Sequence, residues 1–381
     1  MRVIIAPDKF KGSLTASEAS RAIERGVLLA APEATIELAP LADGGEGIVE
    51  ALVEATGGVL VEVTVGGPLG APTLASFGLL GDGRSAVVAM ASASGLGLIP
   101  NDRRDPSRTS TRGTGELILA ALGSQISHLI VGIGGSATND GGAGMAQALG
   151  YRLLDHDGNE IEPGGGSLDA LDRIDATGVN PLVAQAKIEV ACDVANPLCG
   201  LDGASRIFGP QKGATPEQVE RLDANLAHLA RIIRRDLNVD ALNLPGGGAA
   251  GGLGAGLVAF TGSTLRSGIS LVMEAVNLKG RLVDADLCLT GEGALDASTI
   301  SGKTVSGVAG LARSLGVPTF VLVGTIGPGA EAILNAGADA YFSICPGPTS
   351  LDRAIQEADG WLALAAEQAT RAFLAGVRRP R

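Results

Sequence analysis

Lysines, hydroxyls and carboxylates gather near the start of the chain, in a loop that could hold an anion. The string Ala6 to Thr15 places Lys11 and Ser13 just before the predicted helix, with Asp8 among them. Because the N-terminus of a helix presents unpaired N–H groups, a cation beside it favours phosphate or carboxylate binding. An ordinary solvated loop with a helix cap is the alternative, since Thr15 and Glu18 fit a capping box.

Two glycine loops carry further acidic and polar side chains. The string Pro40 to Gly47 presents Asp43 among glycines that allow backbone amides to approach a ligand closely, and the string Gly132 to Gly142 combines a glycine turn with Asp140. The polar or glycine residues that we single out in these two loops are Asp43, Gly44, Gly45, Gly134, Gly135, Ser136, Asn139 and Asp140.

Three more loops lie in the middle of the chain. Asp193 follows the β-rich run 188–191 and could bind Mg²⁺ or act as a base, although an Asx turn would also explain it. Lys212 lies in a rigid turn beside Pro210, and the run Gly246 to Gly256, with Gly247 and Gly248, offers many backbone amides. A tightly packed helix or hinge is the alternative for that glycine run, but its glycines would destabilise a helix.

The last such segment joins two acids, glycines and a lysine. Gly291, Glu292 and Asp296 follow an apolar strand, and Lys303 stands near the start of a helix. The string 301–304 superficially suggests a P-loop, but Ala297 occupies the position that would have to be glycine. Walker-type nucleotide binding is therefore rejected.

Other chemistries have weaker patterns. Gly132, Gly134 and Ala137 formally match a dinucleotide-binding fingerprint, but the residues up to Gly142 would interrupt the helix that must carry the pyrophosphate. The three histidines have no zinc-ligand spacing, and Ser94 lacks the nucleophile elbow of serine hydrolases. Acid and lysine chemistry remains.

Alternating strand and helix patterns must position these loops. Strands are expected at 3–6, 35–41, 129–133, 285–290, 319–323 and 340–344, and helices at 16–27, 48–55, 143–149, 216–236, 305–315 and 330–335. Residues 73–80 and 84–91 flank a Gly-Asp-Gly turn and predict an antiparallel hairpin. Strand and helix alternation indicates an α/β fold with a doubly wound parallel sheet.

The chain is long enough for two domains. We expect residues 1–65 and 285–381 to form a doubly wound α/β domain, and residues 66–284 to form an inserted mixed α/β domain. The segment 107–149 could belong to either domain, and the active site is expected in the cleft between them.

Composition limits the partners. The formal net charge is −12, and no basic stripe is evident outside the tail Arg378, Arg379 and Arg381, so nucleic acid and anionic membranes are not expected partners. The apolar run at the N-terminus is too short for a signal peptide and the longest uncharged stretch is too short to span a bilayer. Four scattered cysteines indicate reduced thiols, which predicts a cytoplasmic protein.

Taken together, the strings resemble the type 1 glycerate kinase family. The strings that carry the resemblance occur in the family's order from residue 4 to about residue 345; they are APDKFKGSLT, PLADGGEG, RGTGELI, GGSATNDGG, CDVANPL, FGPQKG, GGGAAGGLGAG and TGEGALD with SGKT. The resemblance implies a two-domain α/β enzyme that transfers the γ-phosphoryl group of ATP, with Mg²⁺, to D-glycerate. The 2-phosphoglycerate product is favoured and 3-phosphoglycerate is the other outcome; a homodimer is compatible with the resemblance.

Phosphoryl transfer needs the charge of the moving group to be neutralised, and our hypothesis assigns the following roles to the residues. Lys11, Lys212 and Lys303 would bind phosphate or the glycerate carboxylate, and Asp193 or Asp296 would bind Mg²⁺. Asp43 or Asp140 would take the hydroxyl proton, and Arg112 would bind the substrate carboxylate. The remaining binding candidates are Asp8, Ser13, Gly44, Gly45, Gly134, Gly135, Ser136, Asn139, Gly247, Gly248, Gly291 and Glu292.

Two departures from the family pattern and two rival functions stay open. Lys9 stands where the family usually has Ser, and Ser298 where it usually has Gln, so substrate position or nucleotide contacts could differ. The first rival is an NAD-dependent dehydrogenase of a small hydroxy acid that uses Gly132, Gly134 and Ala137. The second is a non-catalytic sugar-acid sensor, against which the full set of charged loops argues.

Overall fold

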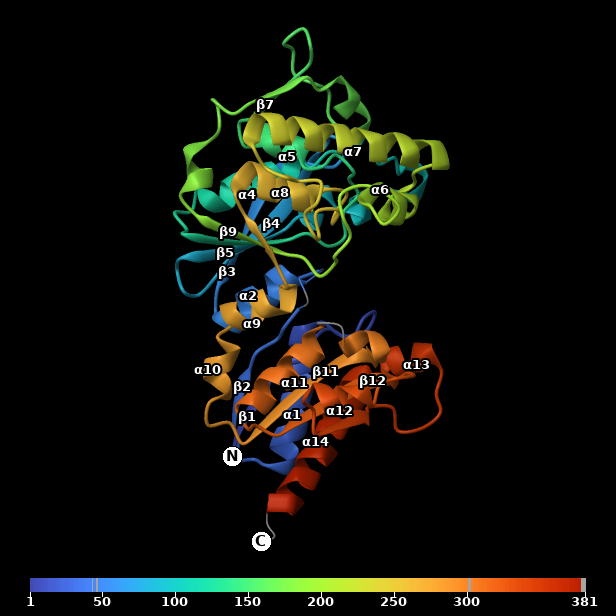
Figure 1. The fold of residues 1–381 in the computed structure, drawn as a ribbon. Helices are drawn as coiled ribbons and strands as arrows, with labels where there is room; N and C mark the ends of the chain where they lie inside the picture. Colours follow the sequence, from blue (N-terminus) through green and yellow to red (C-terminus); the bar gives the residue numbers. More distant parts are fainter. Residues whose placement is uncertain (43, 46, 301–302, 378–381) are drawn as a thin grey trace. The chain divides into compact units, whose positions relative to one another are not determined.

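The computed structural model describes residues 1–42, 44–45, 47–300 and 303–377. It divides into two compact units (Figure 1). The first unit comprises residues 1–43, 50–57 and 269–381, and the second comprises residues 44–49 and 58–268. The predicted α/β class is confirmed, because both units combine parallel strands with helices.

The first unit is built on a five-stranded sheet with the order β13-β12-β11-β1-β2, in which all neighbours are parallel. Its strands are β1 (Arg2–Ile5), β2 (Thr35–Leu38), β11 (Leu287–Leu295), β12 (Thr319–Ile326) and β13 (Ala340–Ser343). Its helices are α1 (Ala16–Ala30), α2 (Ile48–Thr56), α9 (Gly268–Ala275), α10 (Leu278–Leu282), α11 (Thr304–Ser314), α12 (Ala332–Ala336), α13 (Leu351–Gln356) and α14 (Ala358–Val377), of which α2 and α9 begin with residues of the second unit.

Helices cover both faces of this sheet. Leu322 packs in one apolar cluster with side chains of α1 and α14, whereas its neighbours Val321 and Val323 pack in a second cluster with side chains of α11 and α12. Successive residues of a strand point to opposite faces, so the two clusters lie on opposite sides of the sheet.

The second unit contains a six-stranded sheet with the order β10-β9-β6-β5-β4-β3. Its strands are β3 (Val59–Gly66), β4 (Pro72–Leu79), β5 (Ser85–Ala89), β6 (His128–Gly132), β9 (Lys187–Ala191) and β10 (Thr264–Arg266); β7 (Arg152–Leu154) and β8 (Arg173–Asp175) form a separate antiparallel pair. The strands β5, β6, β9 and β10 are parallel neighbours, and β3 to β5 are antiparallel. The predicted hairpin at 73–91 is therefore confirmed.

The helices of the second unit are α3 (Ala91–Ser94), α4 (Arg112–Leu122), α5 (Ala143–Ala148), α6 (Ala204–Phe208), α7 (Pro216–Leu237) and α8 (Leu253–Thr261). The long helix α7 begins as the sequence predicts, with a capping box between Thr215 and Gln218 and Pro216 at the first position. Its apolar side chains, among them Leu226 and Leu229, pack in one large core cluster with β6 and β9.

The observed boundaries differ from the predicted ones at two places. The main segment of the second unit begins at residue 58, before the expected 66, because β3 pairs along its length with β4, and residues 44–49 also belong to this unit. It ends at residue 268, before the expected 284, because most of α9 and α10 belong to the first unit. The segment 107–149 lies in the second unit, where β6 pairs with β5 and β9. Among the described residues, no helix is long and apolar enough to cross a membrane.

Candidate active site

In the first unit, Asp8 connects the loop after β1 with the start of α11. The Asp8 side chain is 9% exposed. Thr304 Oγ1 donates a hydrogen bond to its Oδ2 atom at 2.5 Å, and the Lys9 amide donates to its Oδ1 atom at 2.7 Å. The Asp8 amide in turn donates to the Gly291 carbonyl at 2.9 Å. Strings that are almost 300 residues apart in the sequence, APDK and SGKT, therefore meet at the carboxyl end of one parallel sheet.

Glu292 lies in the same neighbourhood and is partly buried. Its Oε1 atom accepts a hydrogen bond from Thr299 Oγ1 at 2.8 Å. Burial raises the pKa of the Glu292 carboxyl to about 7, and the negative charges of Asp8 and Asp296 add to the rise, whereas Lys303 opposes it. Three carboxylates and one ammonium therefore influence one another in a small region of this unit.

The segment from Thr290 to Asp296 is not the loop that the sequence predicts. β11 continues to Leu295, and Gly291 and Glu292 pair in register with Leu322 and Val323 of β12. A Cβ atom on Gly291 would lie 2.2 Å from the Leu322 carbonyl oxygen, so glycine is required by strand packing there. The sequence predicts a loop here because glycine is usually depleted in strands.

The loop after β1 has a mixed outcome. The predicted capping box of α1 is confirmed, since Thr15 and Glu18 bond reciprocally. Lys11 is exposed to solvent, whereas the Ser13 hydroxyl donates to the Ile355 carbonyl at 3.0 Å and is already used within the protein. Gly293 is needed beside this loop, because a Cβ atom there would lie 3.1 Å from the Lys11 amide nitrogen.

The raised pKa of Glu292 gives a prediction for stability. The folded-state pKa of about 7 exceeds the ordinary pKa of 4.5, so the stabilising contribution of the protonated carboxyl is fully present below pH 4.5 and is lost as the pH rises through 7. We expect Glu292→Gln to be more stable than the wild type at pH 8, by at most about 3 kcal/mol, and to match it near pH 5. Urea unfolding of the nucleotide-free protein at both pH values measures this, with exposed Glu33→Gln as the control. Equal stability differences at the two pH values would contradict the assignment.

In the second unit, several loops meet at the carboxyl ends of β6 and β9. A Cβ atom on Gly44 would lie 2.8 Å from the Ala191 Cβ, and one on Gly134 would lie 3.0 Å from the Gly45 Cα, so the two glycine loops are packed backbone to backbone. Asp193, just after β9, is exposed, and its Oδ1 atom accepts a hydrogen bond from the Gly268 amide at 2.9 Å. The candidate Asp43 lies outside the described residues.

Lys212 is buried under the loop that follows β6. Its side chain is 2% exposed, and its Nζ atom donates to Ser136 Oγ at 2.8 Å and to the Thr138 carbonyl at 2.7 Å. Burial lowers the pKa of the Lys212 ammonium to about 7, against the opposing charge of Asp140. The ammonium therefore holds this loop in place.

Asp140 is fully buried and serves the same loop. Its Oδ2 atom accepts hydrogen bonds from the Thr111 amide at 2.8 Å, the Thr111 hydroxyl at 2.9 Å and the Gly144 amide at 3.2 Å. Its Oδ1 atom accepts from the Gly142 amide at 3.2 Å. Burial raises the pKa of the Asp140 carboxyl against these hydrogen bonds. Its acceptor sites are occupied by the protein, which does not suit the direct proton transfer that the sequence suggested.

The other residues of the loop are held as well. Asn139 Nδ2 donates to Ser205 Oγ at 2.9 Å, but the buried Oδ1 atom of Asn139 and the Thr138 hydroxyl have no hydrogen-bond partner. Gly135 has a φ of 77°, a conformation that glycine adopts readily, and its carbonyl accepts from the Leu96 amide at 2.9 Å. The two unpaired oxygens are the atoms of this loop that a ligand or water would satisfy.

The glycine run around Gly247 and Gly248 packs tightly, and the amides of these two glycines are used within the protein. The Gly248 amide donates to the Asn196 carbonyl at 3.0 Å, and the Gly247 amide donates to the Leu244 carbonyl at 2.9 Å. A Cβ atom on Gly248 would lie 2.1 Å from the Pro197 carbonyl oxygen, and one on Gly251 would lie 2.0 Å from the Thr138 carbonyl oxygen. These contacts fit the packing alternative that the sequence had left open, and the phosphate-binding role of Gly247 and Gly248 stays a prediction.

Arg112 lies at the start of α4, with its side chain 52% exposed and its Nε atom 3.3 Å from Glu116 Oε1. Sequence reasoning missed the threonines that bind the two acids, Thr111 beside Asp140 and Thr304 beside Asp8. The signal was available, because each threonine adjoins or belongs to a string already identified: Thr111 precedes RGTGELI and Thr304 ends SGKT. Hydroxyls at such positions are common helix-cap residues, so they did not stand out.

Comparison with known proteins identifies the family of this chain. The model of the glycerate kinase family matches residues 3–374. The glycerate kinase of Bacillus subtilis is 52% identical over 358 residues, and the glycerate 2-kinase of Escherichia coli is 50% identical over 358 residues; each match covers 94% of both chains. A crystal structure assigned to glycerate kinase 2 of Salmonella typhimurium LT2 superimposes with a TM-score of 0.92 at 49% identity and covers all of both chains. The chain therefore belongs to the glycerate kinase family.

Proposed function

We propose that this kinase transfers the γ-phosphoryl group of ATP to the 2-hydroxyl of D-glycerate, giving 2-phosphoglycerate. The observation that carries the proposal is the match over nearly the whole chain to glycerate kinases, one of them a glycerate 2-kinase. The carboxyl ends of parallel strands, where open α/β sheets bind ligands, carry the strings of that family in both units. 3-Phosphoglycerate is the other product that this chemistry allows.

In the first unit, we assign phosphate binding to Lys11 and Lys303. Lys303 caps α11, and Lys11 is exposed on the loop after β1, so both ammonium groups belong to segments whose ends meet around Asp8 and Thr304. Phosphoryl transfer needs the charge of the moving group neutralised by fixed cations, which these residues would supply. Asp8 acts as a positioning residue that joins the two segments.

The donor set also fits Mg²⁺. The described residues contain no group of three or more potential ligands, but Mg²⁺ usually takes only one or two carboxylates and completes its coordination with phosphates and water. The pKa of Glu292 is raised partly by the charges of Asp8 and Asp296, a repulsion that a cation would relieve. We propose either Asp296 with Glu292 in the first unit, or the exposed Asp193 in the second unit, as its carboxylate ligands. Mg²⁺ would neutralise phosphate charge when bound.

In the second unit, we assign the glycerate carboxylate to Arg112 and the loop around Gly134, Gly135 and Ser136 to oxygen binding. Arg112 is half exposed, so its guanidinium can turn from Glu116 to a substrate carboxylate. Lys212 and Asp140 hold this loop from beneath, and Asp43 remains the proposed proton acceptor.

Helices on both faces of the five-stranded sheet support the doubly wound description of the first unit, and the chain order supports an inserted second unit.

The rival functions lose support. The residue after the dinucleotide-like string does not enter a helix, because α5 begins only at Ala143 with Gly142 at a φ of 80°. A dinucleotide fingerprint places the helix N-terminus directly at the pyrophosphate.

The four cysteines are unpaired, which agrees with the proposed cytoplasmic location. The homodimer remains a prediction that sedimentation analysis would test.

Glycerate-dependent release of ADP tests the kinase proposal. Purified protein with ATP and Mg²⁺ should release ADP rapidly only when D-glycerate is added. The sensor alternative predicts glycerate binding without ADP release, and the dehydrogenase alternative predicts that NADH, not ATP, is consumed or formed. Either of those results would overturn the proposal.

A further inference from the structure

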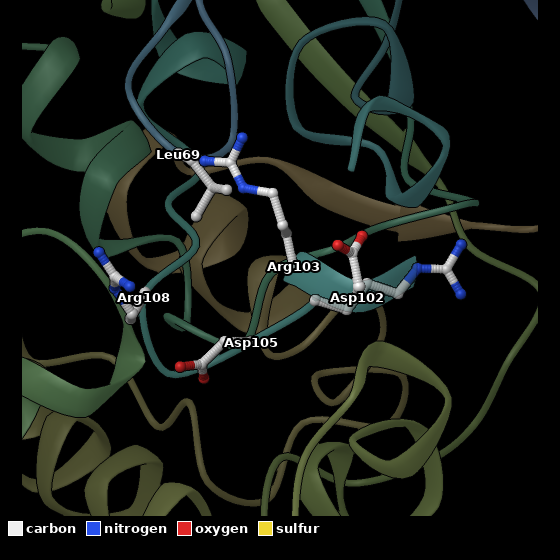
Figure 2. A pocket seen from close by; sticks show the side chains of 6 residues that line it. Leu69, Asp102, Arg103, Asp105 and Arg108 are labelled. Atoms are coloured by element: carbon white, nitrogen blue, oxygen red, sulfur yellow. The ribbon is translucent and has the colours of Figure 1, made fainter. Parts of the chain in front are cut away.

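The second unit contains a pocket that the sequence strings do not include. Its volume is about 440 Å³, and its lining residues are Leu69, Asp102, Arg103, Arg104, Asp105 and Arg108. Figure 2 shows Arg103 extending toward Leu69, while the Asp105 carboxylate points away from both. Leu69 is the one apolar lining residue, so the pocket has no aromatic or broad apolar surface on which a nucleobase could stack.

The three arginines of this pocket differ in burial, because Arg103 and Arg108 are exposed and Arg104 is half-buried. In the part of the chain that the structure describes, no ion pair or side-chain hydrogen bond involves Arg103, Arg104 or Arg108. The Nε atom of Arg104 is buried and has no hydrogen-bond partner. A buried N–H donor without an acceptor is costly, so this one atom points to an acceptor supplied by a ligand or by water.

The acidic residues of the pocket do not replace that ligand. Asp105 Oδ1 accepts hydrogen bonds from the Ser107 amide at 3.0 Å, from the Ser107 hydroxyl at 2.6 Å and from Gln218 Nε2 at 3.1 Å. This oxygen of Asp105 is therefore used by hydrogen bonds within the turn and with α7. With the Asp105 carboxylate occupied, the other charged residues that line the pocket are three arginines and Asp102. Such an excess of positive charge is unexpected in a chain of net charge −12.

The segment that lines the pocket contacts two loops that we place in the proposed active site. A Cβ atom on Gly213 would lie 2.5 Å from the Arg104 carbonyl oxygen, and Gly213 directly follows Lys212. Beyond Arg108, Thr109 Oγ1 donates to the Ala137 carbonyl at 2.9 Å. The segment that lines the pocket is therefore packed against both the Lys212 turn and the loop after β6.

We propose that this pocket binds a small phosphorylated carboxylic acid of the product class. Planar guanidinium forks match phosphate and carboxylate oxygens, and three of them suit a ligand with two anionic groups. The volume accommodates a three-carbon phospho acid. The identity of the ligand rests on the proposed function, but the anion chemistry of the pocket does not.

Calorimetric titration of the full chain with 2-phosphoglycerate, without ATP, tests the proposal. We expect saturable binding that inorganic phosphate competes away, and a loss of affinity of at least about tenfold in Arg104→Gln. Arg103→Gln with Arg108→Gln should weaken binding as well, and Arg104→Lys should lie between the wild type and Arg104→Gln. The exposed Arg234 on α7 provides the control, and Arg234→Gln should bind within about twofold of the wild type. Thermal melting verifies that each variant is folded.

Unchanged 2-phosphoglycerate affinity in both arginine variants would overturn the proposal. ADP-release kinetics then distinguish the two sources of the ligand. A higher KM for glycerate in Arg104→Gln would make the pocket a subsite of the reaction, whereas an unchanged KM with weaker inhibition by added 2-phosphoglycerate would make it a separate product site; both follow from the proposal. Phosphate binding at the arginines in a protein that does not phosphorylate glycerate would contradict the proposed function alone.

Discussion

Asp193→Asn should lower kcat about a thousandfold or more while leaving the protein folded. The Asn Oδ1 atom can still accept the hydrogen bond that Gly268 donates to Asp193 at 2.9 Å, so the loop after β9 keeps its local contact. The substitution removes the negative charge and replaces one carboxylate oxygen with an amide nitrogen. In our proposal that charge holds Mg²⁺ against the phosphates, and loss of electrostatic stabilisation at a phosphoryl-transfer site has large effects on rate.

Steady-state ADP release and Mg²⁺ titration together measure this effect. The exposed Asp202 offers a matched control on a nearby loop of the same unit, and Asp202→Asn should retain nearly full activity. Because Asp193 is exposed, the thermal midpoints of both variants should stay close to that of the wild type. Full activity in Asp193→Asn would remove Asp193 from the proposed metal site.

Lys212→Met should lower kcat/KM at least a hundredfold, because it leaves Ser136 Oγ and the Thr138 carbonyl without their donor. Met has a similar length and no charge, so the cavity stays filled. The cost to stability should be small, since burying an ammonium is itself unfavourable. The exposed Lys279, replaced in Lys279→Met, is the control.

The pH dependence of unfolding separates the charge of Lys212 from its packing. Burial lowers the folded-state pKa of Lys212 to about 7 from 10.5, so between these pH values the unfolded chain binds more protons and the stability of the wild type rises with pH. The slope is at most about 1.4 kcal/mol per pH unit. Lys212→Met should lack this increase. A parallel pH dependence in both proteins would show that Lys212 titrates normally.

Most helices and strands could be predicted because the spacing of their apolar residues and their β-branched side chains indicate the local backbone structure. Short β-branched runs became β1, β6 and β12, and the helical spacing after Thr215 became α7. β11 was predicted to end too early because its glycines are required by contacts with β12, which is a long-range effect. The start of the second unit also depends on a long-range contact. The edge strand β3 is defined by its pairing with β4 and not by its own composition.

The sequence predicted which residues belong to the candidate site, but it did not predict which of them are buried. The sequence identified Asp8, Lys212 and Asp140, but it could not show that two of them lie beneath a loop with their hydrogen-bonding capacity used by the protein. The arginine pocket was missed although Arg103, Arg104 and Arg108 lie within six residues of one another. These arginines form no long basic stripe in the sequence, and the significance of the cluster depends on the pocket and on the buried Arg104 Nε atom, which only the structure shows.

Phosphorus NMR of the products is the most direct test of the central claim. Protein, ATP, Mg²⁺ and D-glycerate should yield ADP together with the resonance of 2-phosphoglycerate, at a rate that Asp193→Asn nearly abolishes. A resonance of 3-phosphoglycerate would keep the kinase and correct the hydroxyl. ATP that remains intact in the presence of D-glycerate would contradict the account.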